Sequence, residues 1–139
     1  MEYKRIEQSI ILRLDPGEEI VSCILALAEQ ENIRLAEINA LGATNDFTVG
    51  VYNLEEQKFY PNHFTGAYEI SSLHGTITTM DGKPYLHLHM NAANEKGQAC
   101  GGHLKEAFIS ATFEGVIRVL DGTVERRQDE VTGLNILTF

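Results

Sequence analysis

The fold of this chain is organised around the segment Met80-Asp81-Gly82-Lys83-Pro84-Tyr85-Leu86-His87-Leu88-His89-Met90. Asp-Gly tolerates positive φ angles, so residues 80–84 predict the turn of a β-hairpin. After the turn, apolar and ring-bearing side chains alternate with the period of two that is typical of a strand. The apolar members then face one side of the sheet, and the other side carries Tyr85, His87 and His89.

The two alternating histidines, together with His103, predict a three-imidazole metal site. Residues two apart on a strand lie about 6 to 7 Å apart at the backbone, so the rings of His87 and His89 can converge on one ion. His103 follows Gly101 and Gly102, which allow a backbone turn that a residue with a side chain would resist. A metal of the zinc type binds neutral imidazole nitrogen at about 2 Å, and three protein ligands leave one position open for water. A purely structural role for the histidines stays open as the alternative.

Other side chains compete for a place in this site. Cys100 could supply a thiolate, although a single cysteine is more often a small buried apolar residue. The predicted hairpin places His74 on the strand beside the two alternating histidines, but we interpret His74 and His63 as surface or packing residues. Glu95 could act as an acidic ligand, yet its spacing fits poorly.

Upstream of the hairpin, the sequence predicts one strand and one helix. Residues 4–14 alternate and are rich in β-branched side chains, which favours a strand. Asp15 can cap a helix that starts at Pro16, with Glu18 completing a capping box. We expect the helix to end near Asn32. Its apolar residues recur at three- and four-residue spacing and form one stripe: Ile20, Val21, Ile24, Leu25, Leu27 and Ala28.

The remainder of the chain is predicted to be mostly sheet. The strand-like stretches are residues 35–41, 46–53, 66–79, 84–92, 111–120 and 134–138. The segment 94–106 is polar and rich in glycine. We interpret it as a loop that can carry function on a rigid sheet.

Length and charge limit the classes of function. With 139 residues the chain fits a single domain, 1–139. It carries 11 basic and 20 acidic side chains, and its formal charge of −9 repels the phosphate backbone of nucleic acids. The nearest basic cluster is Arg118 with Arg126 and Arg127. Acidic residues are interspersed with it, so we interpret it as a solvated surface.

Nothing in the sequence indicates a secreted or membrane protein. No apolar run is long enough to span a bilayer, and the N-terminal residues lack the core of a signal peptide. Cys23 and Cys100 form no disulfide framework and suit a reducing compartment. We therefore expect a cytoplasmic protein with no membrane partner.

Four segments in a fixed order carry a family resemblance. They are Gly66-Ala67-Tyr68-Glu69-Ile70, Ser72-Leu73-His74-Gly75, Leu86-His87-Leu88-His89 and Gly101-Gly102-His103-Leu104. In order and spacing they resemble the plants and prokaryotes conserved (PPC) domain family, which also forms the C-terminal part of plant AT-hook nuclear proteins. The resemblance runs over nearly the whole chain. It implies an α+β fold, in which a mostly antiparallel β-sheet is covered by one main α-helix, and a homotrimer.

The resemblance also bears on metal and DNA binding. For prokaryotic members it implies a metal bound by histidines equivalent to His87, His89 and His103, the same set that the spacing predicts. In the plant relatives, an Arg-Gly-Arg-Pro hook carries DNA binding. This chain lacks that hook and is strongly acidic, so DNA binding is disfavoured.

Our leading hypothesis is a trimeric, cytoplasmic PPC-domain protein with a divalent transition metal held by the three histidines near the glycine-rich loop. Zinc is the first choice, although imidazole suits several first-row ions. The open position could take a small-molecule ligand. The alternative is a regulatory module that meets a protein partner or DNA, with structural histidines. Enzymatic activity stays open, because hydrolysis needs a general base and only Glu69 and Glu95 are candidates.

Overall fold

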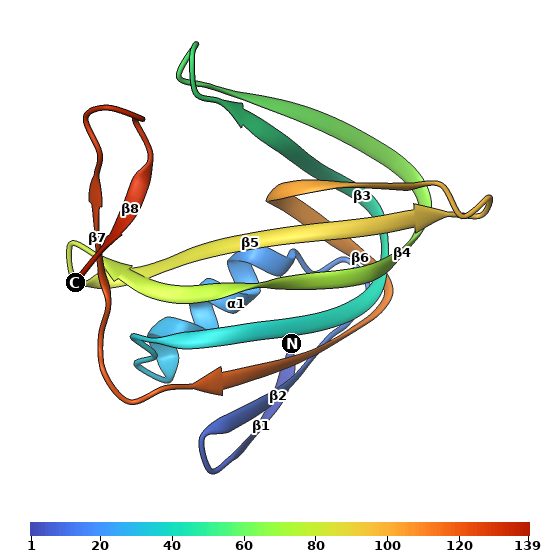
Figure 1. Cartoon of the computed structure of the whole chain (residues 1–139). Coiled ribbons are helices and arrows are strands. Elements are labelled where there is room, and N and C mark those ends of the chain that lie inside the picture. The colour runs from blue at the N-terminus through green and yellow to red at the C-terminus, as the bar shows by residue number, and fades with distance from the viewer.

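The computed structural model describes residues 1–139 and contains eight strands and one helix. They are β1 (Glu2–Ile6), β2 (Ser9–Leu14), α1 (Ile20–Gln30), β3 (Ala36–Asn53), β4 (Lys58–Met80), β5 (Lys83–Asn94), β6 (Ala99–Val119), β7 (Glu125–Gln128) and β8 (Asn135–Thr138). All the strands join in one sheet of order β1-β2-β6-β3-β4-β7-β8, and β5 pairs with both β4 and β6 (Figure 1). Every pairing is antiparallel except a single parallel bridge between β4 and β7.

The predicted architecture, a mostly antiparallel sheet with one helix, is therefore confirmed in outline. The expectation that the helix covers the sheet holds only roughly, because α1 has just 11 residues and packs chiefly on β5 and β6. It ends at Gln30, close to the predicted Asn32. No helix in the structure combines the length and the hydrophobicity that crossing a membrane would require.

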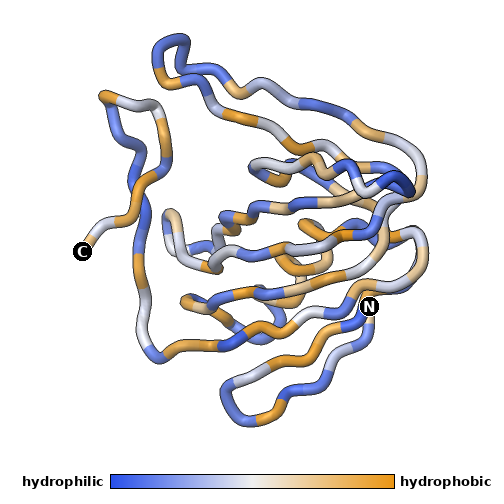
Figure 2. Tube along the Cα trace, turned by 45° about the vertical axis from the view of Figure 1, so that its right-hand side comes forward, coloured by the Kyte–Doolittle hydropathy of each residue, from blue (hydrophilic) through white to orange (hydrophobic).

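A single cluster of 23 buried hydrophobic residues holds the helix against the sheet. The strands contribute rows of side chains that follow the pairing register, such as Ile10 opposite Ile117 and Ile117 opposite Ile38. The helix contributes Ile20, Ile24, Leu27 and Ala28. Figure 2 shows hydrophobic residues gathered towards the centre of the molecule, while the tip of the β3–β4 hairpin is hydrophilic. Burial of this apolar surface is the main force that fixes the sheet and the helix together.

The start of the helix differs from the prediction, because α1 begins at Ile20 and not at Pro16. The predicted capping-box contact exists, since the N–H of Asp15 donates to the Glu18 carboxylate at 2.8 Å, but it closes a turn before the helix. Glu19 is extended, with φ −97° and ψ 126°, so helical geometry starts only after it. Its carboxylate then caps the helix by accepting two backbone N–H groups.

The predicted strand at residues 4–14 is wrong as a single element. These residues form the β1–β2 hairpin, with Ile6 opposite Ser9 and Glu7 at a φ of 53° in the turn. The turn contains no glycine, asparagine or proline, so the alternation of side chains ran through it without a visible break.

Two other predicted strands merge into one. The stretches 35–41 and 46–53 both belong to β3, which continues through register shifts between Ala40 and Gly42 and between Thr44 and Asp46. Such shifts bend a strand without ending it. The predicted stretches 66–79 and 111–120 are parts of the longer strands β4 and β6.

The predicted loop 94–106 is also corrected. Only its first part is a turn, which two hydrogen bonds between Asn94 and Gln98 close. The backbone N–H of Gln98 donates to the side-chain oxygen of Asn94 at 3.0 Å, and the backbone N–H of Asn94 donates to the carbonyl oxygen of Gln98 at 3.1 Å. From Ala99 the chain is β6 and pairs with β5, with Cys100 opposite Ala92. The glycines and polar residues that suggested a loop lie in a strand.

A C-terminal hairpin of β7 and β8 stands at one side of the sheet (Figure 1). The charged sequence of β7 gave no strand signal, and the strand pairing of β7 with β4 is limited to Thr79 and Glu125. Arg126, which we interpreted as part of a solvated surface, is 8% exposed. Its guanidinium lies 4.8 Å from the centre of the Tyr85 ring, and its Nε donates to the Thr78 hydroxyl at 2.8 Å.

Candidate metal centre

The hairpin at residues 80–84 forms as predicted and sets which side chains the outer face of the sheet carries. Met80 pairs with Lys83 across the turn, and along β5 the buried Leu88 and Met90 alternate with the exposed His87 and His89. The predicted assignment of faces is confirmed. The two histidines lie on the face that points away from the hydrophobic core.

The third histidine comes from the neighbouring strand. His103 on β6 pairs directly with His89 on β5. The ring centres of His87 and His89 are 5.2 Å apart, those of His87 and His103 are 5.3 Å apart, and those of His89 and His103 are 5.6 Å apart. One ligand nitrogen from each ring lies within 4.8 Å of the other two. The structure thus brings together all three residues that the sequence singled out.

The glycines before His103 have a different role from the predicted turn. A Cβ atom on Gly101 would lie 2.5 Å from the carbonyl oxygen of Met90, and one on Gly102 would lie 2.5 Å from that of Gly50. Real Cβ atoms do not approach backbone oxygen so closely. The two glycines therefore let β6 fit between β5 and β3, and this close packing places His103 beside His89.

The environment of His87 and His103 favours the neutral form of these two rings. The pKa of His87 is lowered to about 4, first by removal of water from the ring and then by the charges of His103, Arg126 and His89. Burial also lowers the pKa of His103, and the proximity of His89 adds to the effect. A metal binds imidazole only through a deprotonated nitrogen, so at pH 7 both rings are in the form that can bind.

The donor set and its spacing fit a divalent transition metal. A tetrahedral ion with bonds of about 2.0 to 2.1 Å to nitrogen holds its ligand atoms about 3.3 Å apart. The ligand nitrogens lie within 4.8 Å of one another, and rotation of the three side chains about their χ angles would bring them to that separation. Three imidazoles would leave the fourth position of such an ion open.

The other candidates do not join this group. His74 pairs with His89 across β4 and β5, and their ring centres are 6.3 Å apart. The Nε2 atom of His63 lies 2.7 Å from an Asp46 oxygen, away from the triad. Cys100 contacts the carbonyl oxygen of Ala92, and burial raises the pKa of its thiol. No carboxylate belongs to the group, so Glu69 and Glu95 are absent from it.

Residues that sequence reasoning missed surround the triad. Phe59 near the tip of the β3–β4 hairpin packs edge-on against His103, with ring centres 5.8 Å apart. Tyr85 shares the face of His87 and His89, and Arg126 lies over its ring. The parity of the strand could have identified Tyr85. Nothing in the sequence could have placed Phe59 or Arg126, because both contacts join distant parts of the chain.

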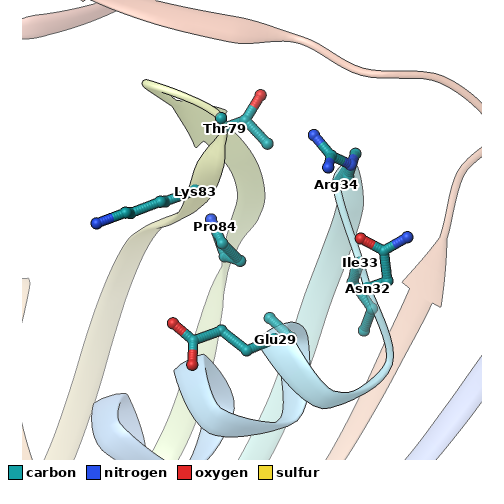
Figure 3. Close-up of a pocket in the computed structure, with 9 residues that line it drawn as sticks. Glu29, Asn32, Ile33, Arg34, Thr79, Lys83 and Pro84 are labelled. Atoms are coloured by element: carbon teal, nitrogen blue, oxygen red, sulfur yellow. The ribbon is translucent and has the colours of Figure 1, made fainter.

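Two hollows lie outside the triad. The first, of about 280 Å³, sits between the end of α1 and the β4–β5 turn, and Glu29, Arg34 and Lys83 are among the residues that line it (Figure 3). The second, of about 470 Å³, crosses the outer face of the sheet from Ile11 and Val116 to His74. Only the second adjoins the candidate site, because His74 pairs with His89.

Comparison with known proteins adds a family and a fold. A sequence model of the Plants and Prokaryotes Conserved (PCC) domain matches residues 1–121. The metal-containing protein of Archaeoglobus fulgidus is 31% identical, with a TM-score of 0.88 over 99% of this chain and 97% of that one.

Two further solved structures are similar. A Bacteroides thetaiotaomicron protein, whose name provisionally assigns DNA binding to it, is 30% identical, with a TM-score of 0.97 over 99% of this chain and 96% of that one. A plant- and prokaryote-conserved protein of Pyrococcus horikoshii is 27% identical, with a TM-score of 0.87 over 99% of this chain and 94% of that one. No curated protein matches the chain.

Proposed function

This chain belongs to the Plants and Prokaryotes Conserved domain family, and we propose that it is a metal-binding member, in which His87, His89 and His103 hold one divalent transition ion. The observation that carries the proposal is the convergence of three ligand nitrogens within 4.8 Å on one face of the sheet. The metal-containing relative from Archaeoglobus fulgidus, at 31% identity over almost the full length of both chains, supports it. The proposal assigns binding and not a reaction.

Zinc is the ion that the donor set favours. Neutral imidazole is a preferred zinc ligand, and a site with three protein ligands keeps one position for an exchangeable group. When bound there, the ion would act as a Lewis acid at that open position. The protein supplies the rest: close strand pairing that fixes His89 and His103, and surroundings that keep the rings of His87 and His103 neutral by lowering their pKa values. We also propose a cytoplasmic location, since the two cysteines are free thiols.

Metal analysis tests the proposal directly. After reconstitution with zinc and removal of free ion, we expect about one zinc per chain by mass spectrometry of the elements. His87→Ala/His103→Ala should retain none while its circular dichroism stays that of the wild type. His63→Ala removes an exposed histidine paired with Asp46 and serves as the control. A reconstituted wild type without zinc, or a double variant with as much zinc as the wild type, would contradict the proposal.

We further propose that three copies of the chain assemble into a homotrimer. The number three comes from the family resemblance, and an exposed apolar surface supports self-association. Ile11, Leu41 and Val116 are 45%, 55% and 45% exposed and line the hollow on the outer face of the sheet. Apolar side chains that gather in one exposed hollow mark an interaction surface, and a closed symmetric assembly would cover each copy's surface.

Introducing a charge into this hollow tests the assembly. Val116→Glu would place a carboxylate beside Glu114 in the proposed interface, so we expect a fall in mass from three chains to one in light scattering after gel filtration. Val131→Glu, at a position 82% exposed in the turn between β7 and β8, should leave the mass unchanged. A wild type with the mass of one chain would refute the trimer, and a trimeric Val116→Glu variant would refute this interface.

A regulatory module that binds DNA is the second candidate, and the name of the Bacteroides thetaiotaomicron relative favours it. The charge of this chain opposes it. A formal charge of −9 gives a repulsion from phosphate that a local basic surface would have to overcome. Of the basic cluster, Arg118 is paired with Glu37 at 2.8 Å and Arg126 is buried. Metal binding is therefore the function that the site supports best.

A further inference from the structure

The guanidinium of Arg126 is a buried cation that lacks an acidic partner. Arg126 is 8% exposed, and none of the ion pairs in the structure includes it. Its contacts are neutral: the hydroxyl of Thr78, the carbonyl oxygen of Asn135 at 2.7 Å and the ring of Tyr85. Burying an arginine without a counter-charge is costly, so an anion that completed the site would bind favourably.

The position of Arg126 places this cation next to the triad. It lies over the ring of Tyr85, which precedes His87 by two residues on β5 and so projects from the same face. Thr78, which accepts from Arg126, pairs with Tyr85, and the next outward-facing residue of β4, Thr76, pairs with His87. Arg126 therefore sits at the end of the row of side chains that continues into the histidines.

One nitrogen of the guanidinium remains available. Nε donates to Thr78 and Nη1 donates to Asn135, whereas Nη2 has no hydrogen-bond partner. Since every fully enclosed side-chain nitrogen and oxygen in the structure is hydrogen-bonded, the unpaired Nη2 is not fully enclosed. An arginine with an accessible nitrogen is a strong donor to carboxylate and phosphate oxygens.

The C-terminal hairpin holds Arg126 in this place. Its turn is tied to the tip of the β3–β4 hairpin, because the Tyr52 hydroxyl donates to the Thr132 carbonyl at 3.0 Å and the Gln57 side chain donates to the Val131 carbonyl at 3.0 Å. The two hairpins thus meet beyond β5 (Figure 1). The family model ends at residue 121, ahead of this hairpin, whereas the solved relatives align over 99% of the chain and so extend into it.

We propose that Arg126 makes the metal site selective for a small oxyanion, of which one oxygen occupies the open position of the ion while another accepts a hydrogen bond from Nη2. This inference rests on the proposed metal site. The shared chemistry of the ligand is a carboxylate or phosphate group that carries at least two oxygens. A metal ion at the triad and the guanidinium would together neutralise its charge.

Cobalt loading gives a readout that needs no activity, because the visible spectrum of bound Co²⁺ changes when its fourth ligand changes. The loaded protein is titrated at constant ionic strength with acetate in one series and with inorganic phosphate in the other. We expect at least one anion to change the spectrum, and the change to reach a plateau as the anion concentration rises. The series with the lower dissociation constant identifies the carboxylate or the phosphate as the better ligand.

Substitution of Arg126 then tests the assignment. Arg126→Gln should bind as much cobalt as the wild type. Its affinity for the anion should fall roughly tenfold to a hundredfold, because that is the loss expected when a hydrogen bond to a charged group is removed. Arg127→Gln removes an exposed neighbour of the same charge and should bind the anion as the wild type does. If Arg126→Gln does not fold, Arg126→Lys is measured in its place. Lysine keeps the positive charge but lacks the planar guanidinium, so the affinity for the anion should also fall several-fold.

The possible failures are distinguishable. A wild type that binds no cobalt would overturn the metal site and this inference with it. A wild type that binds cobalt but shows no spectral response to either anion would overturn the inference alone. Equal anion affinity in the wild type and in the folded Arg126 variant would do the same.

Discussion

Replacing Gly75 with alanine is expected to destabilise the protein by about 3 kcal/mol, at the upper end of the usual cost of overpacking a core. Gly75 lies on β4 opposite Leu88, and a Cβ atom there would stand 1.9 Å from the carbonyl oxygen of His87. Because this carbonyl oxygen belongs to the backbone, it cannot move away by a side-chain rotation. The β4–β5 pairing must therefore open beside His87, the first of the proposed metal ligands.

Urea unfolding followed by circular dichroism measures this effect. Gly115→Ala is the matched control, because the nearest atom to its added methyl group is a side-chain carbon of Phe113 at 3.1 Å, which can yield. We expect a much smaller loss of stability for the control. If Gly75→Ala unfolded at the same urea concentration as the wild type, the close approach of β4 and β5 at His87 would be wrong.

Removing His89 is expected to lower the affinity for zinc by about a hundredfold or more. Loss of even an outer partner of a ligand costs up to about a hundredfold, and His89 is proposed to bind the ion itself. Its ring forms one corner of a nearly equilateral triangle, 5.2 Å from His87 and 5.6 Å from His103, which are themselves 5.3 Å apart. Competition against a chromophoric chelator gives the dissociation constants.

His74→Ala separates a ligand from a neighbouring histidine. His74 pairs with His89 and its ring is 6.3 Å away, but it stands outside the group whose nitrogens converge. We expect His74→Ala to bind zinc with the affinity of the wild type. If His74→Ala lost zinc as His89→Ala does, the ligand set would have to include His74. If neither variant lost it, zinc would bind elsewhere.

The sequence was sufficient to predict the candidate site where local geometry controls it. The alternation along residues 85–90 assigns His87 and His89 to one face regardless of how the rest of the sheet is arranged. The Asp81-Gly82 turn fixes which strand lies beside them, and this hairpin formed as predicted. Both signals depend only on neighbours in the chain.

The errors arose where distant contacts decide the structure. Gly101 and Gly102 suggested a loop, but their lack of side chains serves the close packing of β6 against Met90 and Gly50. Composition cannot separate a glycine required by a turn from one required by a neighbouring strand. Arg126 likewise belongs to a charged segment that looks solvated until the C-terminal hairpin packs it on Tyr85.

X-ray diffraction recorded on either side of the absorption edge of zinc, from a crystal of the reconstituted protein, tests the metal site most directly. We predict one anomalous peak per chain, at about 2 Å from a nitrogen of each of His87, His89 and His103, with a fourth position free of protein atoms. The absence of a peak there, or a peak only at some other group of side chains, would contradict the proposed function.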